Sequence, residues 1–402
     1  MQAPIDQNWQ LALAALSRMP VDTPAQRAAR EARFLALCPL EYAGVERRPY
    51  EESAAQDVPR ATFKTLPFRV RDTPLGVGAE AVQLLVRRDH MDFAMRVSRA
   101  GKSDAEEIAK HMVLERLRVL YPELLRNVVQ MVDFRLYRGL DLSVYPAPSN
   151  AEVDPGPDHP RMVAFTQRLH STLGKARAAL VHAPQQDDGT RYFDLVLGAI
   201  TQMLCQLHVL NTLADEFVHN DLHFGNMMLR DPLPQDRVRS GELHYELRMS
   251  VEPTAQAAFK LRVPLALTGG RVMCLIDLGK SALVHRPRAE PADQVMGGPH
   301  GSERLYSNDA FYIVKWLHED AKDAEELGSS VVARALAMLT ELLAFIVEHH
   351  PPEHRGNRLA LAEILRDAPQ FARFRADAGL SEASSPFLRQ DSQVTLVRQP
   401  IN

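Results

Sequence analysis

Two periodic patterns of hydrophobic and polar residues divide this chain into two regions. Between residues 61 and 145 the apolar positions come in short alternating runs, which predict strands, around one longer segment with helical spacing that starts at Ser103 and ends near Leu120. Beyond residue 160 helical spacing dominates and predicts helices at 191–213, 309–319 and 321–349. The chain is therefore predicted to be an α+β protein in which a small β-rich part, which we call the N-lobe, precedes a large helical part, which we call the C-lobe.

The same pattern sets the expected domain boundaries. Residues 147–160 are rich in Pro, Asp and Asn, which predicts a surface loop or linker between the lobes. An N-terminal extension is predicted to hold helices at 7–19 and 23–37, and the polar C-terminal tail is predicted to be loose. The four parts are the extension, the N-lobe, the C-lobe and the tail, at residues 1–60, 61–146, 147–380 and 381–402.

An insertion within the C-lobe shows strand-like alternation. Residues 231–271 contain two alternating segments, at 244–250 and 259–264, which predict a hairpin. Thr268-Gly269-Gly270 follows, and this sequence favours a turn into a further strand that ends at an acid, Asp277.

The strongest candidate for chemistry is the polar segment 219–226, which reads His-Asn-Asp-Leu-His-Phe-Gly-Asn. Asp221 precedes Asn226 by five residues, and a second carboxylate, Asp277, stands at the end of an apolar run. Phosphoryl transfer from a nucleotide needs one carboxylate to accept the hydroxyl proton, and an Asn and another carboxylate to hold magnesium. The 219–226 pattern alone is only moderately specific for phosphoryl transfer. The assignment therefore also requires the other nucleotide-binding motifs, in order, upstream of it.

The other motifs occur upstream of the 219–226 segment in the required order. Gly76 and Gly78 lie in a glycine turn whose backbone can approach a phosphate closely. The predicted strand Phe93-Ala94-Met95-Arg96-Val97 carries a basic residue, and Glu115 follows Arg96 by nineteen residues on the predicted helix. Glu106 and Glu107 compete with Glu115 as the partner of Arg96, and the spacing favours Glu115.

With these motifs the chain resembles the protein-kinase family from about residue 70 to residue 320, and the resemblance implies a fold of two separate lobes. The long insertion before Ile276-Asp277-Leu278-Gly279 is similar to divergent Ser/Thr kinases of large DNA viruses. The resemblance implies ATP and Mg²⁺ as cofactors, a protein Ser or Thr as acceptor, Asp221 as proton acceptor, and Asn226 and Asp277 as metal ligands. It also implies that His219 is structural and that Asp309 holds the backbone of the 219–226 segment. The nucleotide contacts it implies are Gly76, Gly78, Val82, Ala94, Arg96, Val144 and Tyr145.

Three departures keep two alternatives open. Ala81 replaces the third loop glycine, Arg96 stands where the family has Lys, and no Ala-Pro-Glu motif is recognisable between Asp277 and Asp309. The last two features suit a pseudokinase, a nucleotide-binding scaffold with little transfer activity. A small-molecule kinase of the aminoglycoside or choline type also uses His-x-Asp-x-x-x-x-Asn and also lacks Ala-Pro-Glu. The intact Asp221, Asn226 and Asp277 favour an active enzyme.

Composition and charge limit the partners and the cellular location that are expected for this chain. The net charge of −4 argues against nucleic acid or an anionic membrane as main partner, and the oligomeric state is not readable from the sequence. Cys38, Cys205 and Cys274 are scattered and are predicted to be buried reduced thiols. No basic start followed by an apolar core opens the chain, and no membrane-spanning run is recognisable, so an intracellular location is expected: the cytoplasm, or the host cytoplasm or virion for a viral protein.

Overall fold

In the computed structural model the described residues divide into two compact units. Unit 1 contains the chain up to Arg116 together with Val129–Arg168, and unit 2 contains Leu117–Val128 and Leu169–Arg398. The predicted N-terminal helices and most of the polar tail lie outside the described residues. The described residues are 60–66, 69–78, 81–88, 91–98, 107, 110, 111, 114, 124–149, 154, 156–159, 161–182, 189–213, 216–233, 236, 238–248, 257–285, 294–296, 309–350, 360–376 and 381–382.

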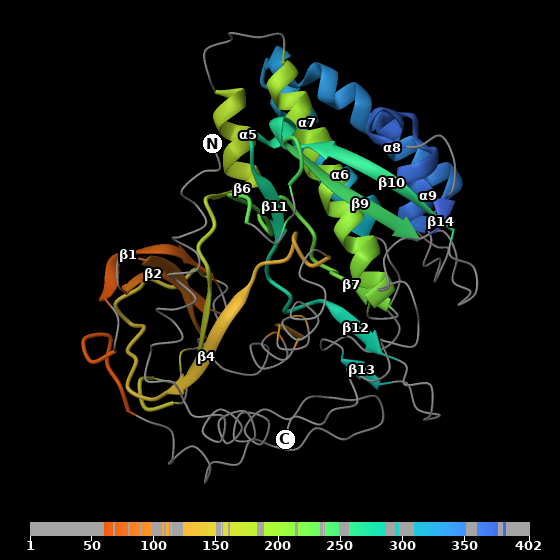
Figure 1. The fold of residues 1–402 in the computed structure, drawn as a ribbon. Coiled ribbons are helices and arrows are strands. Elements are labelled where there is room, and N and C mark those ends of the chain that lie inside the picture. Colours follow the sequence, from red (N-terminus) through yellow and green to blue (C-terminus); the bar gives the residue numbers. More distant parts are fainter. Residues whose placement is uncertain are drawn as a thin grey trace. The chain divides into compact units, whose positions relative to one another are not determined.

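Unit 1 is built on a five-stranded antiparallel sheet with the strand order β1-β2-β3-β5-β4. Alternate residues along most of β2 and β3 are buried, and Leu84 lies opposite Met95 in the middle of the sheet, where both are fully shielded from water. This is the period-two pattern that the sequence showed. The strands, most of them labelled in Figure 1, are β1 (Arg69–Val77), β2 (Ala81–Arg88), β3 (Met91–Ser98), β4 (Met131–Tyr137) and β5 (Arg161–Gln167).

The long helix predicted after β3 is described at four positions. Glu107, Lys110, His111 and Leu114 are helical, and all four side chains are buried. Their spacing of three, four and seven residues places them on one face of a helix. A buried face that contains three ionisable residues requires partners for their charges within unit 1.

The boundary between the units differs from the predicted one. The fully buried Arg161 opens β5, and its guanidinium donates to the carbonyl of Leu140 (2.8 Å) and to that of Gly156 (3.0 Å), and pairs with Asp154. A buried guanidinium needs such acceptors, and these bonds tie part of the predicted linker 147–160 into unit 1. The chain therefore passes to unit 2 after Arg168 and not after Pro146.

Unit 2 is organised around α6, a long apolar helix of which nearly every described side chain is buried. It matches the helix predicted at 191–213. The helices α8, α9 and α5 and the hairpin β9–β10 all contact α6. The α-helices are α5 (Leu173–Val181), α6 (Thr190–Leu213), α7 (Asp309–Glu326), α8 (Ala333–His349) and α9 (Ala360–Asp367). Short 3₁₀ segments are η2 (Leu265–Thr268), η4 (Ser330–Val332) and η5 (Pro369–Phe374).

The break between α7 and α8 lies later than predicted. The sequence reading ended the first helix at Glu319, whereas α7 continues to Glu326. Gly328 then adopts a φ of +91°, and its N–H donates to the carbonyl of Glu325. A glycine in the left-handed region ends a helix readily because it has no Cβ to clash.

The described part of unit 2 also holds three small antiparallel sheets, with strand orders β11-β8-β6, β13-β12-β7 and β14-β10-β9. The first two carry the segments next to the polar residues of interest. Their strands are β6 (Ser171–Thr172), β7 (Glu216–Val218), β8 (Met227–Arg230), β9 (Glu242–Arg248), β10 (Ala257–Pro264), β11 (Val272–Leu275), β12 (Ala282–His285), β13 (Gln294–Met296) and β14 (Ser381–Glu382).

The insertion forms the predicted hairpin, and it is part of the core. Tyr245 of β9 pairs with Leu261 of β10, and both are buried where the hairpin runs along α6 (Figure 1). The turn predicted at Thr268-Gly269-Gly270 has both glycines at positive φ. The start of the tail is also ordered by pairing, since Ser381–Glu382 adds a third strand beside Ala258.

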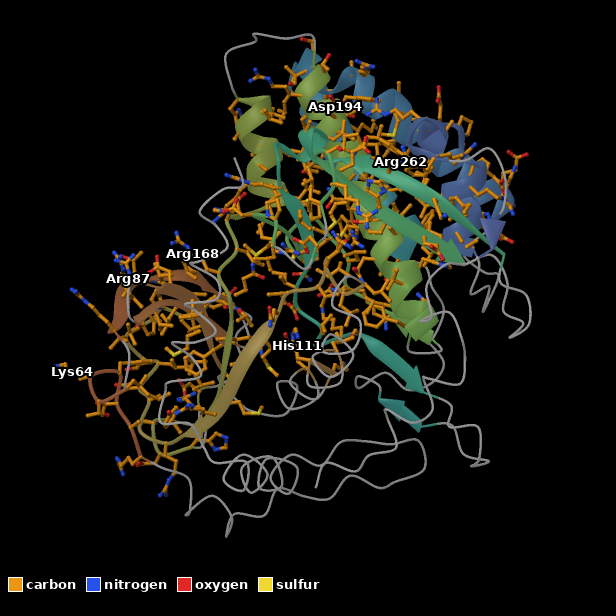
Figure 2. The ribbon with its side chains drawn as sticks, in the orientation of Figure 1. Lys64, Arg87, His111, Arg168, Asp194 and Arg262 are labelled. Carbon is orange, nitrogen blue, oxygen red and sulfur yellow. The ribbon has the colours of Figure 1, made fainter. Side chains whose placement is uncertain are left out.

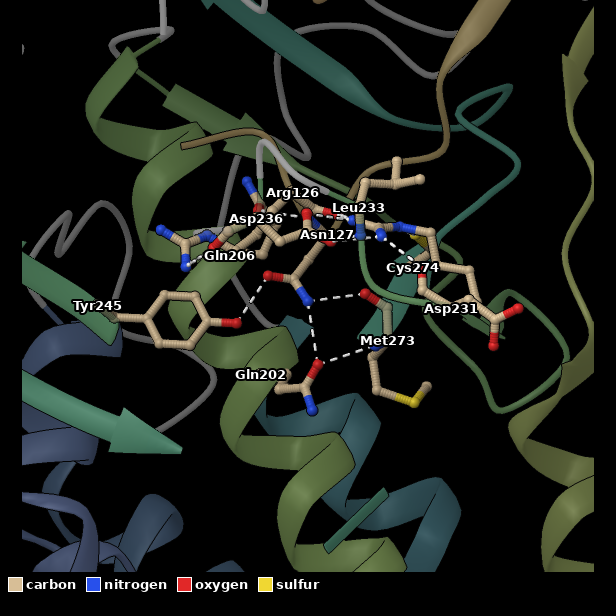
Figure 3. A network of polar contacts seen from close by, with 11 residues as sticks. Arg126, Asn127, Gln202, Gln206, Asp231, Leu233, Asp236, Tyr245, Met273 and Cys274 are labelled. Atoms are coloured by element: carbon tan, nitrogen blue, oxygen red, sulfur yellow. Dashed lines mark hydrogen bonds and ion pairs between the residues drawn. The ribbon is translucent and has the colours of Figure 1, made fainter. Parts of the chain in front are cut away.

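A buried polar network joins the hairpin to the strands β8 and β11 (Figure 3). Asn127 uses both ends of its amide: Tyr245 Oη donates to Oδ1 (2.7 Å), and Nδ2 donates to the carbonyl of Met273 (2.7 Å) and to Gln202 Oε1 (3.2 Å). Nearby, Arg230 forms a fully buried ion pair with Asp236 (2.5 Å). Satisfied buried networks of this kind specify one arrangement of the strands they join.

Two described segments, Thr190–Asn211 and Ser330–His349, are long and apolar enough to cross a membrane by length and composition alone, although the sequence reading found no such run. The first lies in α6, the core helix of unit 2, and such helices are weak evidence of a membrane span. Cys205 and Cys274 are free and buried, as predicted, and burial raises the pKa of the Cys205 thiol; Cys38 lies outside the described residues.

Candidate functional site

The polar loop, residues 219–226, connects β7 to β8. A carboxylate that is distant in sequence holds its backbone in place. Asp309, the first residue of α7, is buried and accepts the backbone N–H of His219 (2.6 Å) and of Asn220 (3.1 Å). Burial raises the pKa of Asp309, while the two N–H groups and His219 oppose that rise. The expected role of Asp309 as the acid that holds this loop has direct geometric support.

A second polar segment, the acidic turn (residues 276–281), lies against the polar loop. Strand β11 pairs with β8, and the ladder continues beyond it because the N–H of Ile276 donates to the carbonyl of Asn226 (3.1 Å). His219 Nε2 lies 3.0 Å from the carbonyl oxygen of Ile276, so that nitrogen carries the proton. These bonds fit the structural role predicted for His219, and they fix Asp277 beside the loop.

Asp221 and Asn226 are linked within the polar loop. The Nδ2 group of Asn226 donates to the backbone carbonyl of Asp221 (2.9 Å), and Asn226 is buried while the Asp221 carboxylate is 28% exposed. The buried Leu222 side chain anchors the turn between them. His223 Nδ1 accepts the N–H of Gly225 (3.0 Å), which gives that imidazole a place in the turn. The loop thus offers one reachable carboxylate and one oriented amide.

Asp277 stands out by its backbone. It has a φ of +60° and its side chain is exposed, whereas the flanking strand β11 is fully buried. Non-glycine residues at positive φ cost free energy, of the order of 1 kcal/mol, and cluster at functional sites. Asn220 in the polar loop has a similar φ of +61°, in a residue type that tolerates this region better than most.

A buried arginine supports the aromatic residue of the polar loop. Arg177 of α5 lies over the ring of Phe224, with 5.1 Å between its Cζ atom and the ring centroid, and its Nε donates to Tyr192 Oη (3.1 Å). A Cβ at Gly174 would come within 2.7 Å of that ring, so α5 needs glycine there to approach the loop. Sequence reasoning missed this support, because α5 has no motif of its own.

Unit 1 contains the predicted basic residue. Arg96 of β3 is 14% exposed, and its Nη1 lies 2.8 Å from Oε2 of Glu107, without the alignment of a hydrogen bond. Burial alone would raise the pKa of Glu107, but Arg96, His111 and Lys110 outweigh it and bring that pKa to about 2. Both charges are therefore present at neutral pH.

Glu107 is the described carboxylate beside Arg96. The sequence reading preferred Glu115 for its spacing to Arg96 and the downstream motifs; Glu115 lies outside the described residues, so that choice stays a prediction. Glu107 shares a buried helix face with Lys110, His111 and Leu114.

The glycine-rich segment forms a hairpin turn, as predicted. Gly76 lies in β1, and the N–H of Gly78 donates to the carbonyl of Ala81 (2.9 Å). Among the described residues, no atom lies within 4 Å of where a Cβ at Gly76 would stand, so their packing does not demand glycine there. Val82 is fully buried in β2, and Ala94 is half-buried in β3.

Val144 and Tyr145 lie in the connection between β4 and β5. Asp141 Oδ1 accepts the N–H of Ser143 (2.9 Å) in a local turn, Val144 is 67% exposed, and the ring of Tyr145 meets that of Phe63 edge to face. These residues were chosen because the N-lobe was expected to end at Pro146. Unit 1 instead ends at Arg168, whose guanidinium pairs with Asp92 (2.6 Å) beside Arg87 (Figure 2).

Comparisons with known proteins assign this chain to no family. No family model and no curated protein matches this chain. Among solved structures, the crystal structure of the PF14_0431 kinase domain is matched with probability 1.00, a TM-score of 0.30 and 13% sequence identity. The match covers 56% of this chain, which spans about half (52%) of that structure.

Proposed function

We propose that this chain is a kinase-like phosphotransferase that uses ATP and Mg²⁺. The observation that carries the proposal is the locking of the polar loop to the acidic turn, which sets Asp221, Asn226 and Asp277 on two adjacent segments. A proton acceptor and two oxygen ligands for a metal are what phosphoryl transfer requires. The positive φ of Asp277 supports a functional role, because non-glycine residues in this region cluster at functional sites.

The donor atoms fit magnesium. The Asn226 amide has its nitrogen turned to the Asp221 carbonyl, which leaves its oxygen as the end that can meet a metal. Mg²⁺ in nucleotide sites is held by one or two protein oxygens together with phosphate and water. In the described ranges no three His, Cys, Asp or Glu side chains gather as a metal cluster, which suits a metal that arrives with its nucleotide. Asn226 and Asp277 would hold it and shield the charge on the phosphates.

Unit 1 supplies the residues that suit the nucleotide. The open space at Gly76 leaves room for a phosphate near the backbone, and Arg96, oriented by Glu107, offers a planar fork to phosphate oxygens. Since the connection to unit 2 follows β5, the segment after Gln167 replaces Val144 and Tyr145 as the candidate for the adenine edge. Val82 and Ala94 remain candidates for the face of the ring.

The transfer step would form one bond and break another. The acceptor hydroxyl oxygen forms a bond to the γ-phosphorus, and the bond from that phosphorus to the bridging oxygen of ADP breaks. The hydroxyl proton passes to the Asp221 carboxylate, and ADP leaves with the electron pair. Positioning and charge stabilisation supply most of the rate, because the protein forms no covalent intermediate.

For the acceptor we propose a protein Ser or Thr, which rests on the sequence resemblance alone. A small-molecule kinase has the same loop chemistry and differs only in its acceptor. A pseudokinase is disfavoured because a chain without chemistry has no reason to keep Asp221, Asn226 and a strained Asp277 in register.

Labelled ATP with Mg²⁺ tests the proposal. Purified protein is incubated with a mixed protein substrate, and in parallel with aminoglycosides and choline, beside an Asp221→Asn variant. This variant keeps size and most hydrogen bonding, so ATP binding should persist while transfer falls about 10²–10⁴-fold. Label in protein identifies a protein kinase, and label in a small molecule identifies the other class. Equal transfer by the variant would remove Asp221 from the mechanism, and an inert wild type that still binds ATP would show a pseudokinase.

A further inference from the structure

A lysine of the acidic turn contacts the proposed proton acceptor. Lys280 Nζ lies 3.0 Å from Asp221 Oδ2, and it donates a hydrogen bond to that oxygen. Lys280 comes directly after Asp277-Leu278-Gly279, so one short turn carries both the metal-binding acid and this cation.

The backbone places Lys280 there. Its carbonyl oxygen accepts the Nδ2 group of Asn220 (3.2 Å), which ties the acidic turn to the polar loop next to Asp221. One residue later, the N–H and the hydroxyl of Ser281 both meet the carbonyl of Leu278 (3.1 and 2.7 Å), which closes the turn. The position of the Lys280 side chain therefore results from a built loop and not from a chance surface encounter.

Stability gives no reason for this pair. The Lys280 side chain is 57% exposed and that of Asp221 is 28% exposed, and exposed ion pairs contribute little to the free energy of unfolding. A lysine that is held beside a general base, in contact with water, is instead available to a ligand.

We propose that Lys280 is a second cation of the transfer site, which acts on the phosphoryl group as it moves. The proposal rests on the proposed function. A hydroxyl that gives its proton to Asp221 lies about 3 Å from that carboxylate. Lys280 Nζ lies 3.0 Å from Oδ2 of the same carboxylate, so the ammonium comes within about 6 Å of an attacking oxygen that contacts Oδ2.

The flexible four-carbon stem of lysine lets the ammonium follow the phosphoryl oxygens while its position beside Asp221 is kept. A positive charge near the oxygens that gain charge lowers the barrier of transfer. Two competing roles are distinguishable. In the first, the Lys280 side chain occupies the position that the substrate would take and so blocks the site. In the second, Lys280 only stabilises the acidic turn.

Four proteins test this: wild type, Lys280→Met, Lys280→Arg and Lys315→Met. Lys315 is a matched control, since this exposed lysine pairs with Glu319 on α7. The readouts are kcat, the KM for ATP, the melting temperature and its shift on adding Mg·ATP. We expect Lys280→Met to lower kcat about 10²-fold, the lower range for one transition-state donor, with KM and melting temperature close to wild type. Lys280→Arg should recover part of kcat, and Lys315→Met should match wild type.

Three results would overturn the proposal while the proposed function stands. An unchanged kcat in Lys280→Met shows a bystander, and a raised kcat shows a side chain that blocks the site. A lowered melting temperature with a loss that Lys280→Arg does not repair shows a supporting role. If wild type transfers no phosphate, or if Asp221→Asn transfers it equally fast, the proposed function fails first and this inference falls with it.

Discussion

Arg96 of β3 and Glu107 of the following helix form an ion pair of 2.8 Å, in which the two side chains are only 14% and 8% exposed. Removal of one partner takes the opposite charge away from a buried ionised group, which typically costs about 3–5 kcal/mol. The pair therefore stabilises unit 1 and also orients the Arg96 side chain.

The first prediction concerns the function of this pair. Arg96→Ala should lose most phosphoryl transfer, and Arg96→Lys should keep a measurable fraction, because a lysine retains the charge without the planar fork. Glu107→Ala should resemble Arg96→Ala. Steady-state transfer by the three variants gives the ranking. An Arg96→Ala variant as fast as wild type, or a Glu107→Ala variant without loss of activity, contradicts it.

The second prediction concerns acid stability. The folded-state pKa of Glu107 is about 2, below its ordinary 4.5, so its contribution is complete above pH 4.5 and is lost as the pH falls through 2. A lowering of this size corresponds to about 3 kcal/mol. Urea unfolding at several pH values should show Glu107→Gln less stable than wild type at pH 7, with a gap that narrows between pH 4.5 and 2. Parallel stability curves would rule out the contribution.

The third prediction separates strain from chemistry at Asp277. Asp277→Gly should raise the free energy of unfolding by about 0.5–1 kcal/mol, because glycine adopts a φ of +60° without penalty, while the Mg²⁺-dependent shift of the melting temperature by ATP disappears. Asp277→Asn is the control that keeps size and tolerates this φ: its stability should stay near wild type, with a weakened shift. Thermal unfolding with Mg·ATP and with ATP plus EDTA measures both. An undiminished metal-dependent shift in Asp277→Gly counts against the metal site.

The fourth prediction tests the insertion as part of the core. Tyr245→Phe removes the hydroxyl that donates to Asn127 Oδ1 and leaves a buried acceptor without a partner, at a cost of about 1–3 kcal/mol. Tyr312→Phe on α7, where the side chain is 45% exposed, serves as the control and should have little effect. Urea midpoints compare the two. Equal midpoints would mean that the hairpin is an appendage.

Local patterns predicted much of the fold and the polar residues of the site. Asp221, Asn226 and Asp277 are found on adjacent segments because each belongs to a motif with fixed spacing. The hairpin was predicted from its alternation, and α6 from its apolar periodicity.

What the sequence missed depends on contacts across long separations. The N-lobe boundary was placed too early because β5 follows a Pro- and Asp-rich stretch, and nothing local shows that Arg161 buries its charge against that stretch. Spacing likewise does not show which face of a helix is buried, so it did not favour Glu107, which lies beside Arg96. Lys280 was overlooked because its partner Asp221 is 59 residues away.

The path of the chain between the units has a consequence for dissecting the protein. Residues Leu117–Val128 belong to unit 2 although β4 and β5 of unit 1 follow them, so no single cut separates the units. A break after Arg168 would leave Asn127 on one fragment and its partners Gln202 and Met273 on the other. The two pieces would then hold complementary halves of one buried network, which makes this chain a candidate for reconstitution from separately expressed fragments.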